Sequence, residues 1–454
     1  MLTSRPRGDP CGFCEGKVVS VTTGEQAGRG DERPLLSDEL AKLQELLPAL
    51  RGDGDPAAKD DLHEAVRRSS KTAADVLRVL RKPAPDQPSW LRTLLDERVR
   101  QGPDLPSWHD QGLIAAGQRF FDDWDLEICT ALFAASLPSA YAGWQGVGVL
   151  ARVSQLAEPG TVARRIGETG QMLLDITQPG ALERGGVGYQ RIVEVRMLHA
   201  AVRAVLLGRD APGGSWPAAN GVPVNQEDLL ATLMTFTVVV FRALDRMGVG
   251  VTLDDQKAYL HLWAVAGDLL GITEARLLDG QPQDVEDLTA KLQESLQAPS
   301  ADGRFLMTVL LHQMELAMPL GWVRVPRTVV RFLIGDRVAD MVGVPGAAWW
   351  SPVLPLAAAL NRRLHRYPMT RHIGALPSRM VGRRVIQLWI DQHQRDERHP
   401  FTVGDERARR WHLADDGGAV TALRGRLRAR RQRLRKCRAR VPLPASPADL
   451  GRQP

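Results

Sequence analysis

The sequence of 454 residues contains only four cysteines, too few for a disulfide scaffold. The sequence does not start with the basic residues and apolar stretch of a secretory signal. We therefore expect a reducing, cytoplasmic setting. Cys11 and Cys14 form a lone CxxC without the second ligand pair that a structural zinc site needs, and no zinc site is predicted. Cys129 lies in an apolar helical pattern and is predicted to be a core residue.

Long uninterrupted apolar runs are also missing. The two longest uncharged runs, residues 128–151 and 341–361, approach the length of a bilayer span. Both are interrupted: the first by Pro138 and three glycines, the second by three prolines, each of which removes a backbone donor that lipid cannot replace. We therefore predict short buried helices joined by turns in both runs, and no transmembrane span.

The common catalytic signatures are absent as well. No P-loop, G-x-G-x-x-G, H-E-x-x-H or G-x-S-x-G pattern occurs, which excludes the commonest nucleotide-binding, zinc-protease and serine-hydrolase classes.

The net charge of +6 has a local origin. Residues 421–440 carry ten basic residues and no acidic one, so the rest of the chain sums to 6 − 10 = −4. A charge run of this kind is either a solvated tail or a contact for an anionic membrane surface or nucleic acid. We accordingly expect a cytoplasmic protein that is peripheral to a membrane if the tail binds lipid.

Hydrophobic periodicity predicts an all-α protein. We divide the chain into a disordered leader (1–34), N-terminal helices and a linker (35–104), a main domain (105–400) and a basic, Pro/Ala-rich tail (401–454). Asp55 and Pro56 predict the start of a helix whose apolar positions extend to Leu80. Strand patterns are nearly absent, which favours a large globular helical bundle. The helical patterns of the main domain are 113–137, 162–176, 189–207, 228–247, 254–270, 285–296, 305–318, 328–342 and 378–392.

Histidines on helices are the main candidates for chemistry. His199 lies within an apolar stripe of its helix, so it is either a satisfied core histidine or a ligand. On the preceding helix, Arg165 and Thr169 are four residues apart and share a face. An arginine on an apolar face needs an anion, which could be the neighbouring Glu168 or a bound group. His261 lies in the interior of a helix that Thr252 and Asp255 are predicted to cap, and we expect a core histidine there.

These residues resemble a known family. The stretch 191–203 around His199 is similar to the histidine helix of the latex clearing protein and rubber oxygenase family, whose superfamily includes the ER-bound oxygenase of mycophenolic acid biosynthesis. Further similarity, in the expected order across residues 105–345, lies in Trp108–Phe121, Ser136–Ala142, Arg165-x-x-x-Thr169, Asn225–Asp228 and Tyr259–Gly271.

The resemblance implies a haem b oxygenase with a largely helical, globin-like core. His199 matches the proximal iron ligand, and Arg165 and Thr169 match the family's distal residues, with Arg165 also a candidate partner for a haem propionate. Latex clearing proteins have a lysine just before that threonine, which can occupy the distal iron position; here the residue is Glu168. Rubber-cleaving members are secreted, so a chain without a signal argues against polymeric rubber as substrate.

The implied reaction uses dioxygen to oxygenate a C=C bond of an isoprenoid or lipid-like substrate, either with or without cleavage of that bond. Two other classes of function stay open at this point: a haem-binding protein without turnover, and a haem-free helical scaffold with a basic interaction tail.

Overall fold

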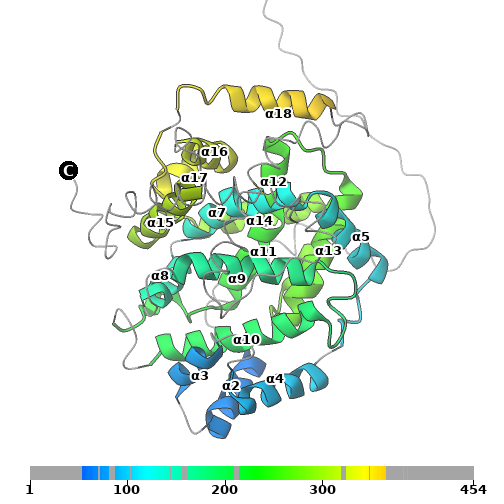
Figure 1. Ribbon diagram of the computed structural model, residues 1–454, viewed down its shortest axis with the longest axis vertical. Helices are drawn as coiled ribbons and strands as arrows, with labels where there is room; N and C mark the ends of the chain where they lie inside the picture. Colours follow the sequence, from blue (N-terminus) through cyan, green and yellow to red (C-terminus); the bar gives the residue numbers. More distant parts are fainter. Residues whose placement is uncertain are drawn as a thin grey trace, which may run out of the picture. The chain divides into compact units, whose positions relative to one another are not determined.

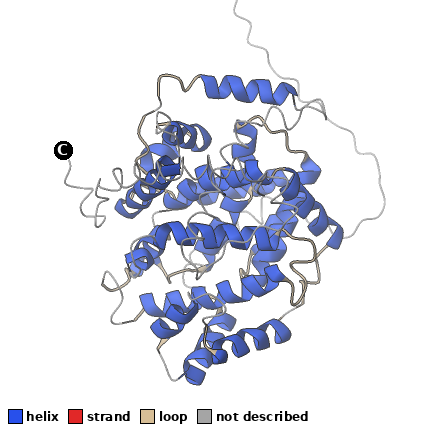
Figure 2. Cartoon of the chain, viewed as in Figure 1, coloured by secondary structure: helices blue, strands red, loops and turns tan. Residues whose placement is uncertain are grey.

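The computed structural model describes residues 54–69, 72–80, 87–102, 104–143, 145–155, 161–208, 214–317, 324–346, 348–364, 382 and 386. The chain divides into two compact units at Arg33 and Pro34, and all the described residues belong to the second. Within them the regular structure is helical, and the single β-bridge joins Gly143 to Gln297 (Figures 1 and 2). The predicted all-α fold is confirmed.

The helices up to the centre of the chain are α2 (Pro56–Ser69), α3 (Ala73–Leu80), α4 (Ser89–Gln101), α5 (Gln111–Asp123), α6 (Asp125–Ala131), the π-helix η2 (Leu132–Ser136), α7 (Leu137–Tyr141), α8 (Val147–Gln155), α9 (Thr161–Ile176) and α10 (Val187–Leu206). They are followed by η3 (Ala218–Asn220), α11 (Gln226–Phe236), α12 (Val238–Arg246), α13 (Leu253–Leu269), η4 (Ala275–Asp279), α14 (Pro282–Leu296), α15 (Ala301–Ala317), α16 (Val325–Ile334), α17 (Asp336–Met341) and α18 (Val353–Leu364).

The predicted helix over 113–137 is in fact several elements. Trp124 leaves the helical conformation (φ −124°, ψ 24°) and separates α5 from α6. Farther along, Pro138 has no N–H to give to the carbonyl four residues earlier, and the chain widens into η2, in which Leu137 N–H donates to Leu132. All five residues of η2 are buried, so short buried helices are confirmed for the run 128–151.

Three other predicted helices are also divided. Thr237 breaks the helix over 228–247 with a non-helical backbone (φ −118°, ψ −85°). Gly335, at φ 80°, ends α16 in a left-handed conformation that glycine adopts without strain. The helix predicted to continue to Leu80 restarts at α3, where Thr72 and Asp75 exchange side-chain hydrogen bonds with each other's backbone N–H.

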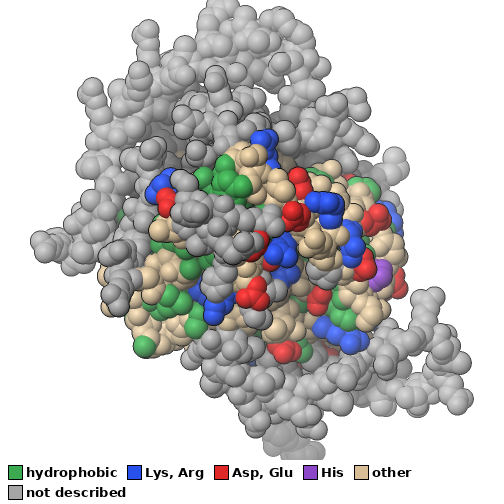
Figure 3. Space-filling model, turned by 90° about the horizontal axis from the view of Figure 1, so that it is seen from below, with side chains coloured by type: hydrophobic (Ala, Val, Ile, Leu, Met, Phe, Trp, Pro, Cys, Tyr) green, Lys and Arg blue, Asp and Glu red, His purple; other side chains and the backbone are tan. Residues whose placement is uncertain are grey.

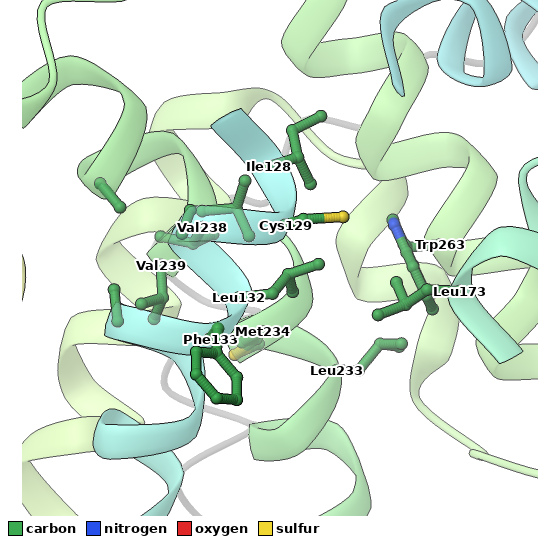
Figure 4. Packing of buried hydrophobic residues seen from close by; sticks show 14 of the residues in the cluster. Ile128, Cys129, Leu132, Phe133, Leu173, Leu233, Met234, Val238, Val239 and Trp263 are labelled. Carbon is green, nitrogen blue, oxygen red and sulfur yellow. The ribbon is translucent and has the colours of Figure 1, made fainter. Parts of the chain in front are cut away.

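The centre of the fold is the contact between α5 and α13. Gly117 of α5 lies so close to α13 that a Cβ there would be 2.5 Å from the carbonyl oxygen of Ala258. Around this contact Tyr259 and Trp263 pack edge-on at 6.2 Å, and Phe236 stacks on Trp263 at 5.2 Å. Figure 4 shows Trp263 beside Leu173 of α9 and opposite Ile128 and Cys129 of α6, and Cys129 is buried as predicted.

Helix α10 lies between two apolar clusters (Figure 1). One side packs on α2, α3 and α4, and the other on α9 and α13. Asp55 accepts from the N-terminus of α2 at Ala58, as predicted for an N-cap, and also pairs with Arg196 of α10 at 2.8 Å. The N-terminal helices are thereby attached to the helix that carries His199.

Helix α18 departs from the sequence prediction. The run 341–361 was expected to form buried helices, but the large apolar residues of α18 are exposed: Val353 by 57%, Leu356 by 69% and Leu360 by 59%. The prediction of burial is wrong here because the smaller residue Ala358 and the polar Asn361 occupy the inward face instead.

The remaining predictions fall outside the described residues. These are the leader 1–34 with Cys11 and Cys14, almost all of the helix over 378–392, and the tail 401–454 with its basic segment 421–440. The division of residues 35–400 at 104 stays a prediction. Within the part of the chain that is described, no helix has both the length and the apolar character needed to cross a membrane.

Candidate functional site

Helices α9 and α10 pack against each other and are joined by residues 177–186. At their junction a Cβ on Gly188 would be 2.9 Å from the Cα of Ile176, so only glycine allows the two backbones to approach this closely. The N–H of Tyr189 donates to the carbonyl of Ala181 and closes the turn. The sequence predicted both helices to within two residues at each end.

A cluster of charges links the two helices near this junction. Arg191 of α10 donates to Asp175 of α9 at 3.3 Å and to Glu194 at 2.6 Å. Burial raises the pKa of Asp175, while the amide of Gln171 and the guanidinium of Arg191 act in the opposite direction. Burial likewise raises the pKa of Glu194 against the pull of Arg191. This cluster was not predicted from the sequence, because its members lie on different helices.

His199 lies in the second half of α10, on the predicted apolar stripe. Ile192, Val202 and Leu206 of that stripe are buried, and His199 is half-buried. Val195, one turn before it, packs against the apolar cluster to which α9 contributes. The stripe is aliphatic before and after His199, but Ile192 and Val195 pack with the cluster that includes α9, whereas Val202 and Leu206 pack with the cluster of α2, α3 and α4.

Glu168 and Thr169 lie on α9, and both are half-buried. On the predicted face of this helix Met172 and Ile176 are buried, which agrees with the helical spacing. Arg165 is part of α9, but its side chain lies outside what the structure describes. Whether Glu168 neutralises it, and whether it faces His199, both stay predictions.

His261 of α13 is a core histidine, as expected. It is 1% exposed, its Nδ1 lies 2.6 Å from the carboxylate of Asp279, and its Nε2 accepts from the N–H of Asp110 at 2.8 Å. The predicted capping box of Thr252 and Asp255 is present at the start of the helix. Since both ring nitrogens are used within the protein, His261 is a structural residue.

The segment Asn225–Asp228 also has a structural role. Asn225 caps α11 by accepting from the N–H of Asp228. Gln226 donates to the carbonyl of Gly271 and accepts from the N–H of Thr273, which joins the start of α11 to the loop after α13. Among the described residues, no group of three or more His, Cys, Asp and Glu side chains is arranged to hold a metal ion.

Comparison with known proteins defines the class. Residues 127–366 match the family model described as ER-bound oxygenase mpaB/B′/rubber oxygenase, catalytic domain. The match covers more than half of the sequence, from α6 to the end of α18, and includes α9 and α10 with His199. This chain belongs to that oxygenase family.

Two relatives support the assignment. The rubber oxygenase of Streptomyces sp. (strain K30) is 26% identical over 267 residues, which are 57% of this chain and 61% of the relative. The chain thus matches less than two thirds of that protein's length. A solved structure of latex clearing protein in its closed state has the same fold, with a TM-score of 0.56 at 22% identity over 74% of this chain and 91% of the other.

Proposed function

We propose that the chain is a haem b-dependent oxygenase that uses dioxygen to oxygenate, and to cleave, a C=C bond of a hydrophobic isoprenoid or lipid-like substrate. The observation that carries the proposal is the placement of His199 on the aliphatic face of α10, within the segment that matches the oxygenase family. In the balanced form of the cleavage, one alkene and one O₂ yield two carbonyl groups.

The residues present fit a haem. A single imidazole suffices as the protein's ligand to haem iron, and His199 is half-buried on a sequence stripe that is otherwise aliphatic, which suits the apolar porphyrin. Gly167 and Gly170 flank Glu168 and Thr169. Because glycine has no side chain, this part of α9 takes up less space. When bound, haem b would supply dioxygen binding and activation.

The protein would supply ligation, polarity and exclusion of water. His199 would hold the iron, and Arg165 would pair with a propionate or with developing negative charge. The hydroxyl of Thr169 offers a hydrogen bond there. Glu168 has a carboxylate where the latex clearing proteins have lysine, so it would accept hydrogen bonds or hold a proton and would not offer an amine to the iron.

The class of substrate is proposed from the side chains around these groups. Met172 and Leu173 of α9 and Ile192 and Val195 of α10 belong to or pack against one apolar cluster, and surroundings of this kind suit a hydrocarbon chain. For the basic segment 421–440 and the cytoplasmic location we retain the sequence-based predictions.

Absorption spectroscopy tests the cofactor. We expect the chain purified after expression with adequate haem to have a Soret band, and His199→Ala to lose or shift it. His312→Ala is the matched control, since His312 is also half-buried on a helix. A wild-type chain without a Soret band would refute haem binding, and an unchanged band in His199→Ala would refute the ligand assignment.

Oxygen consumption tests the reaction. A short linear isoprenoid should be consumed with dioxygen and yield carbonyl products that a hydrazine reagent traps, whereas its saturated analogue should be inert. If the haem-loaded protein consumes neither oxygen nor any unsaturated lipid, the chain is a haem-binding protein without oxygenase activity.

A further inference from the structure

Helix α18 exposes its large apolar side chains instead of burying them. Val353, Leu356 and Leu360 follow one another at helical spacing on one face, and all are more than half exposed. Trp349, just before the helix, is 92% exposed. Amphipathic helices ordinarily bury such a stripe, so this face is shaped for contact with something outside the described fold.

The orientation of α18 is held by contacts on its opposite face. The backbone of Ala358 fits against Gly248, where a Cβ would be 2.1 Å from the Ala358 carbonyl oxygen. Asn361 donates to the carbonyl of Met247 at 2.8 Å, and Arg362 donates to that of Asp245 at 3.0 Å. These contacts fix the small and polar side of α18 on the end of α12 and leave the aliphatic side outward.

The sequence around and after α18 carries formal charge of one sign. From residue 341 to residue 390 the sequence has seven arginines and no aspartate or glutamate. Two of these arginines, Arg362 and Arg363, lie at the end of α18 and are exposed, with Arg362 lying 3.8 Å from Asp245. By contrast, basic and acidic side chains are intermingled on the face of the molecule in Figure 3.

We propose that α18 is an interfacial helix that docks the protein on an anionic lipid surface, with Trp349, Val353, Leu356 and Leu360 inserted among the acyl chains. Its 12 residues extend about 18 Å, too short for a span but sufficient to lie in the interface. Exposed tryptophan is favoured at the headgroup level, and the arginines match anionic headgroups. The proposal does not depend on haem or on turnover.

Vesicle flotation with the full chain tests this surface. Wild-type protein should float with phosphatidylcholine vesicles that contain phosphatidylglycerol, and more weakly with phosphatidylcholine alone. The double variant Leu356→Gln/Leu360→Gln should bind at least about tenfold more weakly, because two aliphatic side chains no longer enter the lipid. The control Leu207→Gln/Leu253→Gln changes two leucines that are 56% and 66% exposed elsewhere, and it should bind like wild type.

The charge is tested separately. Arg363→Gln should weaken binding to anionic vesicles and leave binding to phosphatidylcholine vesicles unchanged. Arg337 is an exposed arginine of α17, and Arg337→Gln should change neither. Circular dichroism establishes that each variant is folded.

Three results would overturn the proposal. The first is an absence of wild-type binding to either kind of vesicle. The second is undiminished binding of the α18 double variant, which would assign membrane binding to another segment such as 421–440. The third is a wild-type oligomer in lipid-free buffer that becomes monomeric in the double variant, since α18 would then contact a second copy of the chain.

Discussion

The helix pairs α5/α13 and α9/α10 each carry a histidine within an apolar pattern, yet they differ in how the protein treats it. In the first pair, His261 is 1% exposed and hydrogen-bonded at both ring nitrogens. In the second, His199 is half-buried on a face of aliphatic residues, beside a helix that carries Glu168 and Thr169. His261 is thus enclosed by the fold, whereas His199 is partly exposed and is the residue that we propose as the haem ligand.

The two pairs are also stabilised differently. The backbones of α5 and α13 are in direct contact at Gly117, with aromatic rings packed around them. The α9/α10 pair has a close glycine contact at its junction and is linked there by the charges of Asp175, Arg191 and Glu194. The first pair is therefore stabilised mainly by close packing of backbone and rings, and the second in part by charge.

The largest expected effect on stability is at His261. His261→Ala should lower the free energy of unfolding by about 3 kcal/mol, because it opens a cavity and removes two hydrogen bonds. Urea denaturation measures this loss. His312→Ala should cost less than about 1 kcal/mol. Equal losses in the two variants would remove the distinction between His261 and an ordinary helical histidine.

A methyl group at the contact of α5 and α13 should come next. Gly117→Ala places a Cβ against the Ala258 carbonyl oxygen and should destabilise the protein by about 2 kcal/mol. Gly148→Ala is the control: it lies in α8, and its Cβ would meet atoms no closer than 3.7 Å. That substitution should be neutral or slightly stabilising in thermal denaturation. A neutral Gly117→Ala would contradict the closeness of the two helices.

The charge cluster of α9/α10 should contribute less. Arg191→Gln should cost about 1 kcal/mol at neutral pH, since Arg191 is 40% exposed and its ion pairs are partly screened, although Asp175 beside it is nearly buried. The deficit exists only while Asp175 and Glu194 are ionised. It should therefore shrink as pH falls and the two carboxyls, whose pKa values burial already raises, take up protons. A deficit that does not vary with pH would exclude the ion pairs as its cause.

The smallest effect is expected at the start of α5. Asp110 caps this helix, and the N–H groups of Leu113 and Gly112 lower the pKa of its carboxyl below 3.8. Asp110→Ala should cost at most about 1 kcal/mol above pH 4. Because the folded pKa is lowered, this contribution should be lost as pH falls through it. Asp110→Asn keeps the cap without its titration, so its stability should lack this pH-dependent step.

The sequence predicted much of the fold through local signals. The capping box of Thr252 and Asp255 placed the start of α13, and periodicity placed α9 and α10. The break at Thr237 was missed because its residue type gives no turn signal, and only the packing of α11 and α12 requires it. The exposure of α18 was missed because periodicity indicates an apolar face without saying which way it points.

The same division applies to the candidate site. The helices, their apolar faces and the presence of His199, Glu168 and Thr169 on them were determined by the sequence alone, because caps and side-chain spacing act over a few residues. Only the tertiary structure showed that both ring nitrogens of His261 are hydrogen-bonded within the protein. His261 is satisfied by Asp279 and by the backbone of Asp110, 151 residues away in sequence. Contacts of that range come from helix packing, which no local pattern encodes.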